Sequence, residues 1–86
     1  MLIQIYTKSN CVWCVVTKEL LNQLQLNYYE FLLDVDFTKA ELMDKLNLEA
    51  DGKITLPQVF INGSSIGGYE DTMEYLEQTG IMGLQT

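Results

Sequence analysis

Apolar and polar positions along the first half of the chain predict two strands joined by a helix. Residues 2–6 alternate and carry β-forming side chains, which predicts a strand. From Val12 to Leu24 apolar residues recur at helical spacing. Residues 28–35 are richer in apolar side chains and predict a second, more buried strand. A helical connection between two strands predicts a right-handed βαβ unit with parallel strands.

The two helices of the first fifty residues each show an apolar stripe that predicts their buried face. In the first helix this stripe consists of Val16, Leu20, Leu21 and Leu24, and Thr17, Lys18, Glu19, Asn22 and Gln23 are expected on the other faces. Thr38 and Glu41 make a capping-box pattern before a second helix, expected over residues 38–48. Its expected buried stripe is Ala40, Met43 and Leu46, with Leu42 beside it.

The last third of the chain predicts a hairpin followed by a helix. Residues 58–61 favour a strand, and Asn62-Gly63 is a strong signal for a tight turn into a fourth strand beginning with residues 64–66. The glycines at 67 and 68 end that strand. Tyr69, Met73 and Leu76 mark a final helix that stops near Gly80.

The resulting order, β-α-β-α-β-β-α, predicts an α/β fold in which three helices flank a four-stranded mixed sheet. The final hairpin makes the last two strands antiparallel. A chain of 86 residues can bury only one small core. We therefore expect a single domain over residues 1–80 and a loose C-terminal tail over residues 81–86.

Charge and composition exclude several classes of function. Twelve Asp and Glu face five Lys, with no Arg, so the formal net charge is −7. Nucleic-acid binding needs clustered cations, and an acidic surface also discourages contact with anionic membranes. The absence of His excludes Cys–His and Ser–His catalysis and His-ligated zinc.

The distribution of apolar and charged residues also predicts where in the cell the protein is found. No apolar run approaches the roughly 20 residues of a membrane span. The first ten residues lack the basic and apolar regions of a signal peptide. We expect a cytoplasmic protein, in a compartment where permanent disulfides are rare.

The two cysteines, Cys11 and Cys14, lie where the first strand gives way to the first helix. Unpaired N–H groups at a helix N-terminus stabilise a thiolate, so the pKa of Cys11 is expected to fall below the free value of about 8.5. The i, i+3 spacing lets the two sulfurs meet in a disulfide. An exposed thiol followed by a shielded one predicts an attacking and a resolving cysteine.

Three other interpretations of this pair fit the sequence less well. A tetrahedral zinc site normally needs four ligands, and only two cysteines and no histidine are present. A structural disulfide that closes so short a loop gains little stability. Two inert core cysteines remain possible in principle, but Asn10 and Trp13 beside them suit a surface loop better. A CxxC motif at the strand–helix junction of a βαβ unit favours redox chemistry.

Beyond these arguments, nearly the whole chain, residues 2–79, resembles a short bacterial or phage-type dithiol glutaredoxin. The segment YTKSNCVWC resembles the active site of that family, TLPQVFING its cis-proline segment, and IGGYED the glycine turn before its last helix. The resemblance implies a thioredoxin-like fold. It also implies an enzyme that reduces protein disulfides and glutathione mixed disulfides, with glutathione as the electron donor and no metal.

The resemblance assigns roles to particular residues. Cys11 matches the nucleophile and Cys14 the resolving thiol. The implied glutathione-binding residues are Lys8, Trp13, Thr55, Leu56, Pro57, Gly68, Tyr69, Glu70 and Asp71. Among them, Lys8 would lie near the thiolate and the glycine carboxylate of glutathione. The backbone of Leu56, which precedes a cis-proline, would pair with its cysteine. Residues 68–71 would hold its γ-glutamyl end.

The sequence departs from the family pattern at several of these positions. Val12 and Trp13 stand where proline and tyrosine are commonest. No arginine is present to hold the glycine carboxylate, and Lys45 is the remaining candidate. Glu70 replaces a smaller polar residue, so its charge is expected to oppose the carboxylate of the γ-glutamyl group.

Two alternatives to a glutathione-dependent enzyme remain open at this point. One is a thioredoxin-like electron donor that a flavoprotein reductase reduces. The other is a module in which Cys11 and glutathione ligate a [2Fe–2S] cluster. The predicted partners are glutathione and disulfide-bearing proteins, with ribonucleotide reductase as an example at the level of the family, and the chain is expected to be a monomer.

Overall fold

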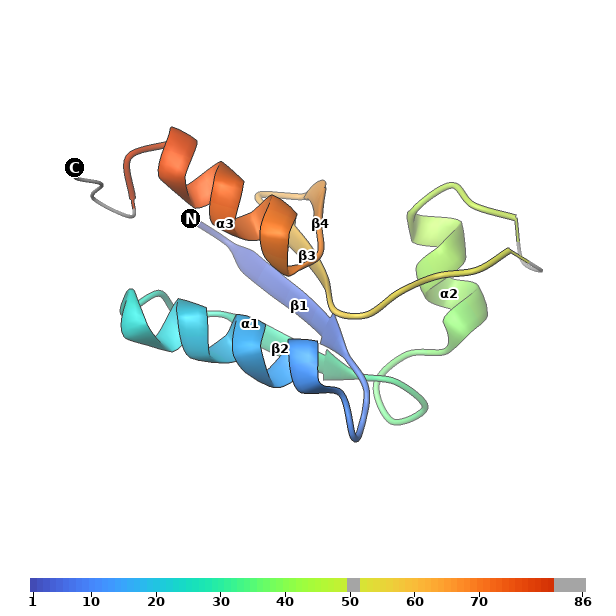
Figure 1. Ribbon diagram of the computed structural model, residues 1–86. Helices are drawn as coiled ribbons and strands as arrows, with labels where there is room; N and C mark the ends of the chain where they lie inside the picture. The colour runs from blue at the N-terminus through green and yellow to red at the C-terminus, as the bar shows by residue number, and fades with distance from the viewer. Residues whose placement is uncertain (50–51, 82–86) are drawn as a thin grey trace.

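The computed structural model describes residues 1–49 and 52–81, and it has the predicted order of elements (Figure 1). These elements are β1 (Ile3–Thr7), α1 (Val12–Gln23), β2 (Tyr29–Leu32), α2 (Lys39–Lys45), β3 (Gln58–Ile61), β4 (Ser64–Gly67) and α3 (Tyr69–Gln78). The second strand and second helix are shorter than the sequence indicated. Thr38 caps α2, and the reciprocal bonds of the expected capping box with Glu41 are present.

The four strands form one mixed sheet in the order β2-β1-β3-β4. β1 pairs with β2 in parallel, as a βαβ unit requires, and β1 with β3 and β3 with β4 are antiparallel. Asn62 and Gly63 adopt positive φ angles of 52° and 85°, which the predicted tight turn between β3 and β4 needs. This topology places the C-terminal end of β1 beside the N-terminal end of β3, where the functional site is built.

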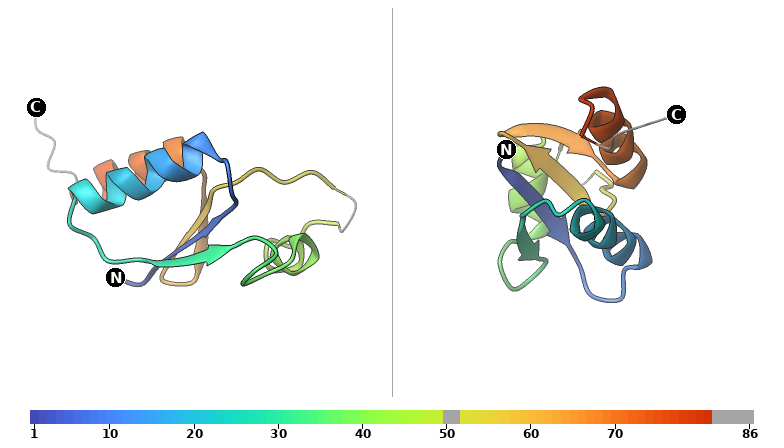
Figure 2. Two further views of the ribbon diagram at one scale, coloured as in Figure 1. Left: turned by 90° about the horizontal axis from the view of Figure 1, so that it is seen from below. Right: turned by 90° about the vertical axis from the view of Figure 1, so that its left-hand side faces the viewer.

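Helices cover both faces of the sheet (Figure 2). α1 and α3 lie side by side on one face, and α2 lies on the other. Alternate residues of the central strands point to opposite faces. The larger core cluster, between the sheet and α1 and α3, consists of Ile3, Ile5, Leu21, Val59, Ile61 and Leu76. The smaller cluster, on the α2 side, consists of Phe37, Leu42 and Phe60.

The rotation of α1 differs from the prediction. Its fully buried residues are Cys14, Thr17 and Leu21, whereas Val16, Leu20 and Leu24 are only half-buried. Thr17 was expected on a polar face, and this was wrong. Its hydroxyl donates to the carbonyl oxygen of Trp13 at 2.7 Å, so burying it leaves no unpaired polar group.

Two further expectations about burial were wrong. β2 was expected to be the more buried strand, but it lies at the edge of the sheet and its first two residues, Tyr29 and Glu30, are exposed. In α2 the buried residues are Leu42 and Met43, and Ala40 is exposed. Both errors have one cause: local periodicity does not reveal which strand is outermost or which side of a short helix meets the sheet.

The C-terminal end of the described chain packs onto the core. Ile81, predicted as the first residue of the tail, contacts the larger core cluster, and its N–H donates to the carbonyl oxygen of Leu76. The rest of the predicted tail, residues 82–86, lies outside the described residues. Within residues 1–49 and 52–81, none of the helices has the length and apolar character needed to cross a membrane.

Candidate functional site

The two cysteines form a disulfide at the start of α1. Cys11 is the N-cap residue of the helix, with extended backbone angles, and Cys14 lies one turn further along, with 5.2 Å between the two Cα atoms. The N–H of Cys14 donates to Cys11 Sγ at 3.1 Å. Cys14 is buried and Cys11 is partly exposed. Cys11 is therefore the sulfur that an incoming molecule can reach.

The loop between β1 and α1 positions the disulfide. Asn10, just before Cys11, has a φ of 54°, a left-handed conformation that asparagine tolerates better than most residues. Thr7 ends β1, and its buried hydroxyl donates to Glu30 on the neighbouring strand at 2.8 Å. The chain therefore reverses direction over three residues from a fixed strand end. This places Cys11 at the N-terminus of α1, where unpaired N–H groups favour negative charge.

A second segment, immediately before β3, approaches Cys11 from across the fold. The peptide bond between Leu56 and Pro57 is cis, as the resemblance implied. Cys11 Sγ lies 3.7 Å from the carbonyl oxygen of Leu56. Pro57 is buried, while Thr55 is exposed. Residues that are 45 positions apart in the sequence therefore meet at the sulfur.

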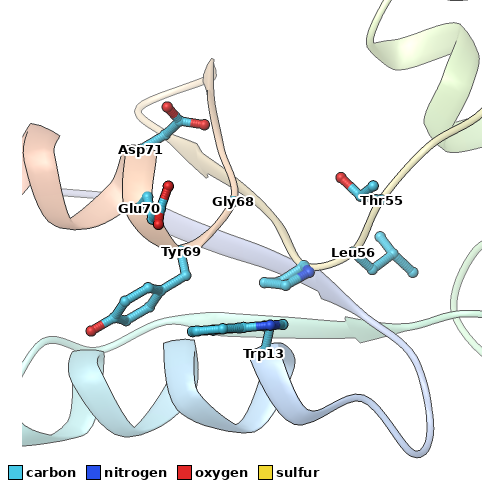
Figure 3. Close-up of a pocket in the computed structure, with 8 residues that line it drawn as sticks. Trp13, Thr55, Leu56, Gly68, Tyr69, Glu70 and Asp71 are labelled. Atoms are coloured by element: carbon cyan, nitrogen blue, oxygen red, sulfur yellow. The ribbon is translucent and has the colours of Figure 1, made fainter.

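Between this segment, α1 and the start of α3 lies a pocket of about 390 Å³, here termed the aromatic pocket (Figure 3). It is lined by Trp13, Thr55, Leu56, Pro57, Gly68, Tyr69, Glu70 and Asp71. These are all the predicted glutathione-binding residues except Lys8. The ring centroids of Trp13 on α1 and Tyr69 on α3 are 5.4 Å apart, with an angle of 36° between the ring planes. Together the two rings form one aromatic wall of the pocket.

The N-terminus of α3 forms the polar end of the aromatic pocket. The first N–H groups of a helix have no intrahelical partner, and the N-cap residue Gly68 has no side chain that could accept a hydrogen bond from them. Glu70 and Asp71 occupy its first turn. Gly67, with a φ of 124°, lies so close to Asp71 that a Cβ atom at this position would collide with the Asp71 carboxylate. The Asp71 side chain could move, but L side chains rarely adopt this φ, so glycine is favoured here.

A different hollow, of about 620 Å³, lies between α1, β2 and the loop after β1, and it is here termed the lysine hollow. It is lined by Lys8, Ser9, Asn10, Cys11, Val12, Cys14, Val15, Lys18, Glu30 and Leu32. Both cysteines contribute to its surface. The disulfide therefore borders the lysine hollow directly, and the aromatic pocket reaches it through Trp13 and Leu56.

An ion pair crosses the lysine hollow from α1 to β2. Lys18 Nζ lies 2.9 Å from Glu30 Oε2, which also accepts the hydrogen bond from Thr7. Partial burial raises the pKa of Glu30, but the hydrogen bonds from Lys18 and Thr7 and the charge of Lys18 outweigh it, so the pKa is lowered. Glu30 is therefore ionised at neutral pH.

Lys8 lies apart from the aromatic pocket but next to the segment that forms it. It lines the lysine hollow and also a smaller hollow, of about 190 Å³, that includes Lys39 and Leu56. Leu56 thus separates the aromatic pocket from two lysines. Lys45, the sequence-based candidate for a carboxylate partner, instead lies over the ring of Phe60 at 5.1 Å.

Lys39 and Lys18 are the residues near the site that sequence reasoning missed. Lys39 starts α2, and only the packing of the segment before β3 against α2 brings it near Leu56. Lys18 looked like an ordinary polar-face residue, although its i, i+4 spacing from Cys14 was a usable signal. Among residues 1–49 and 52–81, no three Cys, Asp or Glu residues are grouped so that they could hold a metal ion.

Comparisons with known sequences agree with this geometry. The family model described as Glutaredoxin matches residues 3–66. Glutaredoxin-C6 of Oryza sativa subsp. japonica is 42% identical over 69 residues, which are 80% of this chain and 61% of that protein. Glutaredoxin 3 of Escherichia coli K12 is 35% identical over 69 residues, 80% of this chain and 78% of that protein. The chain spans only 28–61% of the length of the first four curated relatives.

Comparisons with solved structures identify the same fold. The structure of reduced Escherichia coli glutaredoxin has a TM-score of 0.74 and 27% identity, and the alignment covers 91% of this chain and 95% of that one. The complex of buckwheat glutaredoxin with glutathione has a TM-score of 0.72 and 28% identity, covering 93% and 72%. The four-stranded sheet with three helices is therefore the predicted thioredoxin-like fold.

Proposed function

Because the chain belongs to the glutaredoxin family, whose members are thiol–disulfide oxidoreductases, we propose that it uses glutathione to reduce glutathione mixed disulfides and protein disulfides. One observation carries the proposal. The partly exposed Cys11 of a Cys11–Cys14 disulfide lies beside a pocket built from the cis-proline segment, an aromatic wall and a helix N-terminus. The complex of buckwheat glutaredoxin with glutathione, of similar fold, supports glutathione as the ligand.

The aromatic pocket suits the two ends of a γ-glutamyl tripeptide. The free N–H groups at the start of α3 attract a carboxylate, and Asp71 offers an acceptor to an ammonium group. The middle of the tripeptide would lie along residues 55–57, with its sulfur towards Cys11. Its other carboxylate would then point past Leu56 towards Lys8, with Lys39 beside it. Glu70 is the one group in the pocket whose charge opposes this ligand.

The proposed reaction is an exchange of sulfur–sulfur bonds. The Cys11 thiolate attacks the glutathione sulfur of a mixed disulfide, and the other thiol leaves as a thiolate. A second glutathione thiolate attacks the glutathione now bound to Cys11, which releases glutathione disulfide and restores the Cys11 thiolate. When the substrate is a protein disulfide, Cys14 instead attacks Cys11 and forms the disulfide seen in the structure.

The test is turnover of a glutathione mixed disulfide, with glutathione disulfide formation coupled to glutathione reductase. Wild type should turn over only when reduced glutathione is present, and Cys11→Ser should fall to the uncatalysed rate. Wild type that is reduced by a flavoprotein thioredoxin reductase, but not by glutathione, would contradict the proposal. The thioredoxin-like alternative would then account for the fold and the disulfide.

A further inference from the structure

We propose that the lysine hollow is a docking groove for an acidic segment of a disulfide-bearing protein substrate, separate from the aromatic pocket that holds the small thiol. This inference rests on the proposed exchange chemistry, because docking has a purpose here only if Cys11 reacts with the docked partner. The occupant is a polypeptide with Asp or Glu residues close to its disulfide.

The charge of the lysine hollow is opposite to that of the rest of the molecule. The chain has a formal net charge of −7, yet this hollow is lined by Lys8 and Lys18 against a single carboxylate, Glu30. That carboxylate already accepts hydrogen bonds from Lys18 and Thr7. The aromatic pocket, by contrast, is lined by Glu70 and Asp71 and by no lysine. An acidic segment is therefore attracted to the lysine hollow and repelled from the aromatic pocket.

One side of α1 gives the lysine hollow an exposed apolar edge. Val12 and Val15 are three residues apart, so they lie along the same side of the helix, and their exposed fractions are 73% and 50%. Lys18 continues this row by another three residues. Leu32, half-buried on β2, lies across the hollow. A polypeptide can thus place apolar side chains against the two valines and carboxylates near the two lysines.

The partly exposed Cys11 borders the lysine hollow, and the buried Cys14 lies one turn further along α1 within disulfide-bonding distance of it, which permits the full exchange. The Cys11 thiolate attacks one sulfur of the docked disulfide, and the partner's other sulfur leaves as a thiolate. Cys14, as a thiolate, then attacks Cys11 Sγ and displaces the partner's first sulfur. The partner leaves with two thiols after protonation, and two electrons have passed to it. The protein keeps the Cys11–Cys14 disulfide observed here.

The experiment compares two peptide disulfides that differ only in four flanking residues, Asp in one and Asn in the other. Wild type should reduce the Asp peptide with a higher kcat/KM, and added salt should shrink the difference. Lys18→Glu should lower kcat/KM for the Asp peptide about fivefold. Glu30→Lys adds positive charge to the same hollow and should raise it. A glutathione mixed disulfide of a small neutral thiol should be turned over equally by wild type and Lys18→Glu.

Two controls separate docking from general electrostatics and from misfolding. Lys53→Glu makes the same change in net charge at an exposed residue that lines neither the lysine hollow nor the aromatic pocket. This variant should leave the preference for the Asp peptide unchanged. The double variant Lys18→Glu with Glu30→Lys restores an ion pair of reversed orientation. It should recover most of the lost rate, because the net charge of the hollow is again that of wild type.

Several results would overturn the docking groove. One is an equal kcat/KM of wild type on the Asp and Asn peptides. Another is an equal loss of kcat/KM for the Asp peptide in Lys18→Glu and Lys53→Glu. A third is a loss in Lys18→Glu that is as large for the glutathione mixed disulfide as for the Asp peptide. Should wild type reduce no disulfide at all, the proposed function itself fails. Docking is then tested by NMR, with an Asp peptide whose cysteines are serines. Shifts at Val15, Lys18 and Leu32 support the groove, and shifts confined to Tyr69 and Glu70 refute it.

Discussion

The aromatic pocket and the lysine hollow border the same disulfide and have opposite character. The first is lined by two aromatic rings and two carboxylates, and its polar end is a helix N-terminus. The second is lined by two lysines and the exposed Val12 and Val15. The contrast shows that a net charge of −7 describes the whole chain but not the surroundings of its reactive sulfur. A ligand that approaches Cys11 therefore meets different charged groups on the two sides of the disulfide.

The largest effects are expected when either cysteine of the disulfide that both regions border is replaced. Cys11→Ser should abolish every exchange reaction. Cys14→Ser should keep turnover of a glutathione mixed disulfide, because a second glutathione can resolve the intermediate, and should lose most reduction of protein disulfides. Steady-state rates on both substrates measure the difference. If both variants lost both activities alike, the assignment of attacking and resolving sulfurs would be wrong.

Trp13→Ala should act mainly through the aromatic pocket. It removes one of the two rings that form the wall, and an aromatic contact of this kind is worth about 0.5–1.5 kcal/mol. We expect the KM for a glutathione mixed disulfide to rise about fivefold, with a smaller change for a peptide disulfide. Trp13→Phe is the matched control and should keep most of the affinity. Equal losses on both substrates would show that the two regions do not act separately.

Lys8→Ala should affect both substrates, because Lys8 lines the lysine hollow and also lies near Leu56 together with Lys39. We expect kcat/KM to fall about threefold for the glutathione mixed disulfide and for an acidic peptide disulfide. Raising the ionic strength should reduce both effects, since the Debye length at 0.15 M is about 8 Å. A loss limited to the peptide would exclude Lys8 from glutathione binding.

Glu70→Gln is expected to improve binding in the aromatic pocket. The change removes a negative charge beside the helix N-terminus that should hold the γ-glutamyl carboxylate. The KM for a glutathione mixed disulfide should fall about twofold, a typical size for one exposed charge. Glu74→Gln, on the same helix but outside the pocket, serves as the control and should change nothing. An increase in KM would mean that Glu70 contributes to binding.

The smallest expected effect concerns stability. The lowered pKa of Glu30 means that its ion pair with Lys18 stabilises the fold fully above about pH 4.5, and the contribution disappears as the pH falls through the pKa of the folded state. Because the pair is partly exposed, Glu30→Gln should cost only about 0.5 kcal/mol at pH 7. Urea unfolding at a series of pH values below pH 7 measures this, with the exposed Glu19→Gln as control. A loss that is the same at every pH at which the protein still folds would exclude the charge as its cause.

The order of elements could be predicted because each one carries its own local signal. The parallel pairing of β1 with β2 followed from the connecting helix, and the Asn62-Gly63 turn was evident from two residues. The burial of Thr17 could not be predicted, because a threonine is counted as polar until its hydroxyl is seen to bond the Trp13 carbonyl. The exposure of β2 depends on the order of the strands, which local patterns do not contain.

The site was predictable to a similar extent. The cysteines stood out through their spacing, whereas the segments 55–57 and 68–71 were found only through the resemblance to glutaredoxins. No local pattern could place Lys39 beside Lys8, because α2 and the loop after β1 meet only through the packing around Leu56. The ion pair of Lys18 with Glu30 likewise joins a helix to a strand. Contacts between distant segments therefore decide the charge around the sulfur.

The position of Trp13 also gives the protein a built-in optical probe. It is the only tryptophan in the chain, it lies between the two cysteines in the sequence, and more than half of its side chain is exposed. Disulfides quench indole fluorescence on contact, so the emission intensity of the unlabelled molecule should follow the state of its sulfur pair. Its emission wavelength should report separately on the polarity of whatever fills the space beside Tyr69. One spectrum can thus follow electron transfer and ligand occupancy in the same sample.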